Sequence, residues 1–218
     1  MSQAPTTTPF IRRSVSLGTL VLIASIAGCG GGSDSASPAP SPAPAPATKS
    51  ISTTVIDGAL QNVRVCMDRN DNGSCDTGEP SAVTNAAGQA SLEVPEADVG
   101  KFPILALVTK DSVDADTGAV PVAFILRAPA DQPGVVSPLS TLVQAHSQAT
   151  GSSTSDAAAA IQSQLGLGTS ALADFTQDGS DAGKLAATMA RLIVVTTQTQ
   201  LTNTAGATGV DGAPPPSV

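Results

Sequence analysis

The chain has 218 residues, of which 41% are hydrophobic and only 2% aromatic, and its formal net charge is −8. With 10 basic residues against 18 acidic ones, its surface repels nucleic acid and anionic lipid headgroups, so neither is an expected partner. The single histidine and the absence of Trp and Tyr leave little material for catalysis or for aromatic binding faces.

Residues 1–28 have the features of an export signal. Two arginines, Arg12 and Arg13, precede an apolar stretch at 14–26 that is too short for a stable membrane span. The stretch ends in Ile-Ala-Gly-Cys at 26–29, which resembles the lipobox of bacterial lipoproteins. The resemblance implies cleavage before Cys29 and a lipid anchor on that cysteine; the alternative is an ordinary cleaved signal followed by a chance cysteine.

Glycine, not aspartate, follows Cys29, so no inner-membrane retention signal is apparent, and the expected location is the outer membrane, on its periplasmic face or at the cell surface. Removal of residues 1–28 leaves eight basic residues against 18 acids, a net charge of −10. Residues 29–49 carry a Pro-Ala-Ser run and predict a disordered, extended linker.

Residues 50–130 predict a series of short strands with no helix between them. The runs are rich in β-branched residues or continuously apolar, and Asp57-Gly58 separates the first two. The expected strands are 52–56, 62–67, 82–84, 89–94, 102–109 and 120–127. We therefore expect an α+β protein in which a small antiparallel β-sandwich is followed by a short α-helical segment.

The most specific run of the chain is residues 68–79, Asp-Arg-Asn-Asp-Asn-Gly-Ser-Cys-Asp-Thr-Gly-Glu, which matches a twelve-residue calcium loop at every fixed position. Calcium prefers six to eight oxygen ligands, and the loop offers carboxylate, amide and backbone oxygens with a glycine at the sharp turn. The candidate ligands are Asp68, Asn70, Asn72, Ser74, Asp76 and Glu79. The alternative is an empty turn, because Asn-Gly is also a strong hairpin signal.

Two cysteines remain beside the lipidation site, Cys66 just before the loop and Cys75 inside it. In an oxidising compartment they favour a disulfide over two free thiols. A second acidic run at 111–118 lacks a closing glutamate, so it favours a hairpin turn over a second cation site.

Residues 131–205 have a helical period. Ser137 and Pro138 predict the start of a helix that places Leu139, Leu142, Val143 and His146 on one face. A second helix is expected at about 155–165, ended by Gly166. A third is expected from near Ser180, with a stripe formed by Leu185, Met189, Leu192 and Ile193. Residues 206–218 predict a disordered tail.

The segments 55–59, 62–73 and 76–80 together resemble the prealbumin-like and carboxypeptidase-regulatory-like β-sandwiches of bacterial surface proteins. They are also similar to the calcium-binding B repeats of serine–aspartate-repeat adhesins, which share the Asp-x-Asn-x-Asn-Gly core. The resemblance implies that the loop binds calcium and stiffens the domain. The cysteine pair is not part of the adhesin pattern.

Catalysis is not expected. His146 lies on the apolar face of its predicted helix, no third group is apparent to orient a Ser140–His146 pair, and the ligands of a zinc site are missing. The expected function is a calcium-stabilised structural or adhesion-type module of an envelope lipoprotein, with envelope or extracellular proteins as partners. The alternative is an accessory domain, binding substrate or partner, of a longer enzyme.

Overall fold

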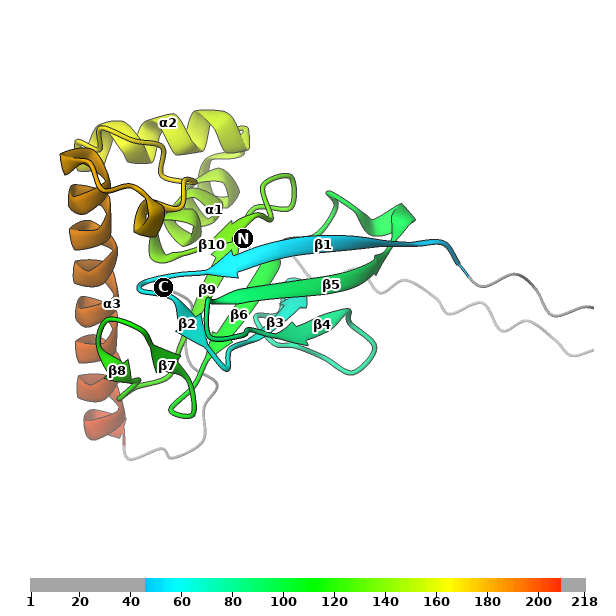
Figure 1. Cartoon of the computed structure of the whole chain (residues 1–218), viewed down its shortest axis with the longest axis horizontal. Coiled ribbons are helices and arrows are strands. Elements are labelled where there is room, and N and C mark those ends of the chain that lie inside the picture. The colour runs from blue at the N-terminus through cyan, green and yellow to red at the C-terminus, as the bar shows by residue number, and fades with distance from the viewer. Residues whose placement is uncertain (1–45, 209–218) are drawn as a thin grey trace, which may run out of the picture. The chain divides into compact units, whose positions relative to one another are not determined.

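The computed structural model describes residues 46–208, with side chains to residue 204 (Figure 1). The predicted signal peptide, Cys29, the linker up to residue 45 and the tail from 209 lie outside the described residues. The strands are β1 (Thr48–Val55), β2 (Leu60–Gln61), β3 (Arg64–Met67), β4 (Ser81–Val83), β5 (Gln89–Pro95), β6 (Ile104–Val108), β7 (Val113–Asp114), β8 (Gly118–Ala119), β9 (Phe124–Ala128) and β10 (Val135–Val136).

Two sheets of order β10-β1-β5 and β4-β3-β6-β9 form the sandwich. The six strands expected from the sequence are present, and β1 begins at Thr48, two residues inside the segment expected to be linker. The pairing is antiparallel with one exception. Strand β10 joins β1 in parallel, with Thr54 opposite Val135 and Val55 opposite Val136.

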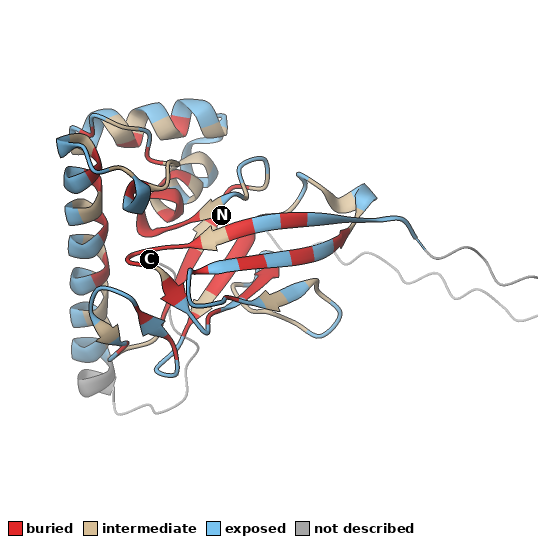
Figure 2. Ribbon diagram, in the orientation of Figure 1, coloured by how far each residue is buried: buried red, intermediate tan, exposed pale blue. Residues whose placement is uncertain are grey.

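The sandwich core follows from the alternation of side chains along the strands. In β5, Ala90, Leu92 and Val94 are buried while the residues between them are exposed, and Figure 2 shows this alternation along β1 and β5. Strands β6 and β9 are buried on both faces and consist of nearly continuous apolar residues. The outer face of this second sheet packs Leu105 and Ile125 around the disulfide.

A third, small sheet of order β2-β7-β8 lies at residues 60–61 and 113–119. The acidic run at 111–118 forms the hairpin that joins β7 to β8, as predicted. The Asp114 side chain closes the turn by accepting hydrogen bonds from the backbone N–H groups of Asp116 (2.7 Å) and Thr117 (3.2 Å).

Three α-helices follow the strands in the described residues: α1 (Pro138–Thr150), α2 (Thr154–Leu165) and α3 (Asp181–Thr208). Ser137 caps α1 by accepting a hydrogen bond from the Ser140 N–H (3.0 Å), and Ser140 Oγ accepts one from the Ser137 N–H (2.8 Å). Gly166 ends α2 in the left-handed conformation, as predicted. Two single-turn 3₁₀ helices, η1 (Glu96–Asp98) and η2 (Phe175–Gln177), lie in the connections.

The predicted apolar stripe of α3 is half right, because Met189 and Ile193 pack against the core of the helical region but the two leucines do not. Leu192 is 58% exposed and Leu185 is 37% exposed, whereas Ala186, Ala190 and Val194 are buried. Small residues let α3 approach its neighbours closely, so the helix packs through alanines while leucines stay outside. Ala186 and Ala190 join the core of the helical region, whereas Val194 joins the sandwich core. The helix also continues to Thr208, three residues into the segment expected to be disordered.

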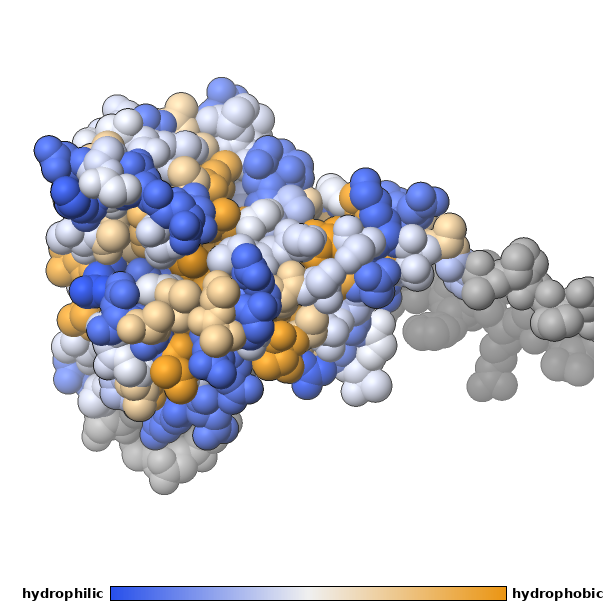
Figure 3. Space-filling model, viewed as in Figure 1, coloured by the Kyte–Doolittle hydropathy of each residue, from blue (hydrophilic) through white to orange (hydrophobic). Residues whose placement is uncertain are grey.

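The sandwich and the helical region belong to one compact unit of the chain. Figure 3 shows polar and apolar side chains interspersed over one face of this unit. Within residues 46–208, no helix combines the length and apolar character needed to cross a membrane.

Candidate functional site

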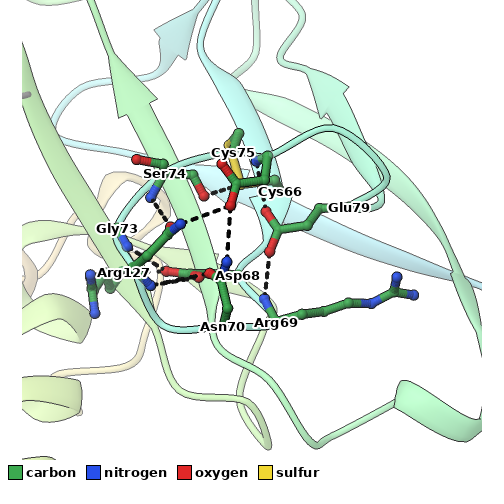
Figure 4. Close-up of a disulfide and its surroundings, with 11 residues drawn as sticks. Cys66, Asp68, Arg69, Asn70, Gly73, Ser74, Cys75, Glu79 and Arg127 are labelled. Carbon is green, nitrogen blue, oxygen red and sulfur yellow. Dashed lines mark hydrogen bonds and ion pairs between the residues drawn. A yellow bond between two sulfur atoms is a disulfide. The ribbon is translucent and has the colours of Figure 1, made fainter.

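The Asp68–Glu79 loop connects β3 to β4 and is fixed to the sandwich at its base. The Met67 N–H donates to the Pro80 carbonyl (3.0 Å), and the Asp68 N–H donates to the Pro103 carbonyl (3.1 Å). The predicted disulfide between Cys66 and Cys75 is present, with 5.6 Å between the Cα atoms (Figure 4). It ties the middle of the loop to β3, because Cys66 is a buried residue of that strand.

Asp68 is the organising side chain of the first half of the loop. It is 1% exposed, and its two carboxylate oxygens accept hydrogen bonds from the backbone N–H groups of Asn72 (3.1 Å) and Gly73 (3.0 Å). Gly73 has φ +74°, which a β-carbon opposes, and a β-carbon there would lie 3.0 Å from Arg127 Nη2. The loop therefore winds around a buried carboxylate, as expected for the first position of a calcium loop.

Asn70, Asn72 and Asp76 come together above that turn. The amide NH₂ groups of Asn70 and Asn72 donate to the same oxygen of Asp76, Oδ2, at 2.9 and 2.7 Å. These two hydrogen bonds lower the pKa of Asp76 below its ordinary value. The amide oxygens accept backbone N–H groups, from Asn72 to Asn70 Oδ1 (3.3 Å) and from Ser74 to Asn72 Oδ1 (2.8 Å).

Glu79 folds back over the end of the loop. Its Oε1 accepts a hydrogen bond from the Arg69 N–H (2.7 Å) and its Oε2 accepts one from the Asp76 N–H (2.9 Å). Each of the three predicted carboxylate ligands thus receives hydrogen bonds from the loop itself. In the described part of the chain, no group of three or more His, Cys, Asp or Glu residues is arranged to hold a metal ion.

Arg127 of β9 is a member of this site that the sequence analysis missed. Its Nη1 pairs with Asp71 Oδ1 at 2.8 Å, and its Nη2 lies 4.0 Å from Asp68 Oδ2. Gln148 of α1 donates to the other oxygen of Asp71 (2.9 Å), so the loop is linked to a strand and a helix far away in sequence. One feature of the sequence could have identified it: Arg127 is the one charged residue of an otherwise apolar strand.

The Ser140 and His146 side chains are not hydrogen-bonded to each other. The Ser140 hydroxyl donates to the Arg127 carbonyl (2.7 Å) and accepts from the Ser137 N–H, so it serves the cap of α1. His146 is partly buried on the same helix, about 1.7 turns further on.

These observations define an α+β protein in which a sandwich and a helical region share one unit and a disulfide-tied polar loop joins β3 to β4. Comparison of the chain with protein-family models, with curated proteins and with solved structures finds no match.

Proposed function

We propose that this chain is a calcium-stabilised structural module of a bacterial cell-envelope lipoprotein, of the adhesion or scaffolding type and without catalysis of its own. The observation that carries the proposal is the winding of the 68–79 loop around the buried Asp68 carboxylate, with Asn70, Asn72 and Asp76 side chains converging beside it. Its partners are envelope or extracellular proteins, which suit a tethered domain with an acidic surface.

The donor set of the loop fits a hard divalent cation. It consists of carboxylate, amide and backbone oxygens, the ligands that calcium takes, and it contains no imidazole; its only sulfur is in the disulfide. Asp68, Asn70, Asn72, Ser74, Asp76 and Glu79 would hold the ion. A bound Ca²⁺ supplies positive charge that neutralises these carboxylates and ties the two halves of the loop together.

Binding is coupled to a rearrangement of the loop. Asn70 and Asn72 now present NH₂ groups to Asp76, and a cation beside that carboxylate requires them to present their oxygens. Each Glu79 oxygen accepts one backbone N–H and keeps a second lone pair that can face an ion. Reorientation of the two amides reduces the net affinity, so we expect a Kd of about 10⁻⁴–10⁻³ M, the range of extracellular modules.

Calorimetry and thermal unfolding test the proposal. Titration with CaCl₂ should release or absorb heat at a stoichiometry of about one ion per chain, and 10 Kd of calcium should stabilise the fold by about 1.4 kcal/mol. Glu79→Gln and Asp68→Asn should abolish both effects. Asp111→Asn is the control, because it removes an exposed carboxylate outside the loop. Unfolding that is identical in calcium and in chelator would remove the basis of the proposal.

The lipid anchor rests on the sequence around Cys29 and needs its own test. Metabolic labelling with a radioactive fatty acid should mark the wild-type protein, and Cys29→Ser should prevent the label. Equal labelling of the two proteins would contradict the anchor and leave the calcium proposal untouched.

A further inference from the structure

A cavity of about 260 Å³ lies between β2, the β7–β8 hairpin and α3. Asp57, Asp114 and Arg191 contribute its charged groups, and Leu60, Phe124 and Val194 are among its apolar walls. It shares no residue with the 68–79 loop. Its volume lies just below the usual range of ligand-binding cavities, which begins at about 300 Å³, so only a compact compound fits it.

Asp57 is the unusual group of this cavity. The residue is 7% exposed, and its Oδ1 is buried without a hydrogen-bond partner in the described part of the chain. A buried carboxylate oxygen without a donor is costly, and such atoms are rare in native structures. The position of Asp57 on the cavity wall therefore indicates that a donor or a cation belongs there.

The neighbouring charges do not fill that role. Asp114 is 4% exposed and its Oδ1 accepts two hydrogen bonds from its own turn. Arg191 Nη2 pairs with Asp116 Oδ2 at 2.8 Å, and both of these side chains are about half exposed. Burial is the main cause that raises the pKa of Asp57 to about 6; Asp114 and Asp116 add to the rise, and Arg191 opposes it. The negative side chains around Asp57 outnumber the positive one, so an added cation is favoured.

We propose that this cavity binds a small aliphatic ammonium compound, with the ammonium group on Asp57 and the hydrocarbon body against Leu60, Phe124 and Val194. A divalent metal ion fits less well, because it needs six or more oxygens whereas the walls are largely apolar and Asp114 Oδ1 is already engaged. A primary ammonium has three N–H donors, which can satisfy the free oxygen of Asp57 and retain one or two for water.

The test uses n-butylammonium chloride as the probe. Binding is followed by ¹H–¹⁵N NMR of the chain without its predicted signal residues 1–28, at pH 7, where Asp57 is ionised. Chelator is present, so the result does not depend on the calcium loop. Saturable shifts should appear at the amides around Asp57 and Val194, and n-butanol, which has the same hydrocarbon chain and no charge, should not produce them. Asp57→Asn should weaken binding at least about tenfold, because a charge-assisted hydrogen bond is lost.

Two further variants make the test decisive. Asp111→Asn removes an exposed carboxylate next to the same hairpin and should bind the probe as the wild type does. Ala119→Leu keeps Asp57 but narrows the cavity that Ala119 lines, so it should weaken binding by a steric effect that does not depend on the Asp57 carboxylate. The proposal is overturned if the shifts have not reached half of their maximum by about 80 mM, the Kd that five non-hydrogen atoms give at the ligand efficiency of drug-sized compounds. Equal binding by both cavity variants and the wild type, or displacement of the probe by CaCl₂ from the Asp57 amides, would overturn it as well.

Discussion

Replacing Asp57 with asparagine should make the protein more stable at neutral pH. In the folded protein, burial and the neighbouring Asp114 raise the pKa of Asp57 from 3.8 to about 6. Below pH 3.8 the carboxyl is protonated in both the folded and the unfolded chain, and it does not affect the free energy of unfolding. Between 3.8 and about 6 the folded chain holds a proton that the unfolded chain has released, so stability falls as pH rises.

Above pH 6 the full cost remains, because Asp57 is then ionised in both states but buried in only one. The difference between the two pKa values corresponds to about 3 kcal/mol, an order-of-magnitude figure. Asparagine has nearly the same shape and does not ionise. The variant should therefore gain stability relative to the wild type progressively from pH 4 to pH 6, and keep that gain at pH 7.

Urea unfolding of the two proteins at a series of pH values measures this difference. The buffers should contain no amines, so that the cavity beside Asp57 stays without an organic cation. Subtracting the two curves cancels groups whose pKa values are lowered, such as Asp76 and Asp178. Asp111→Asn provides the control for loss of an exposed carboxylate. Parallel curves for wild type and Asp57→Asn between pH 4 and pH 7 would refute the reasoning.

Two further predictions concern covalent and steric features of the fold. Replacing Cys66 and Cys75 with serine should lower the free energy of unfolding by roughly 2–3 kcal/mol, from the loop-closure entropy of a crosslink that spans nine positions; urea midpoints that are equal with and without reductant would contradict this. Gly183→Ala should destabilise by roughly 1–3 kcal/mol despite the better helix propensity of alanine, because the new Cβ meets the Asp178 carbonyl, and thermal unfolding measures the loss. Gly179→Ala, where nothing lies within 4 Å, should be neutral, and equal losses in the two variants would refute the steric account.

The features that could be predicted from the sequence are those set by local chemistry. The strand positions follow from β-branched and apolar runs, and the cap of α1 follows from a serine placed before a proline. The disulfide follows from two cysteines in a chain whose first residues predict an export signal. The two cysteines lie nine positions apart, one on β3 and the other in the loop that follows it. The turn around Asp68 is equally local, because Gly73 and the Asx residues determine it.

The features that could not be predicted depend on segments that meet across the fold. Asp57-Gly58 has the sequence of an exposed turn, yet Asp57 is buried because the β7–β8 hairpin and α3 pack over it. Gly58 is required there, since a β-carbon would come close to the Asp114 carboxylate. The stripe of α3 was partly misassigned for a related reason: hydrophobicity favoured leucines, whereas close helix packing selected alanines.

The parallel pairing of β10 with β1 has a consequence for how this protein can be divided. Ile56, directly after β1, is buried among the helices, and its N–H donates to the Val136 carbonyl (2.9 Å). A fragment truncated at residue 130 would lack β10, so one edge of β1 would be unpaired and Ile56 would be uncovered. The unpaired edge of β1 could then pair with another chain and cause aggregation. The strands are therefore not expected to form a stable protein without the helices. The unit that can be moved into another protein runs from β1 into α3.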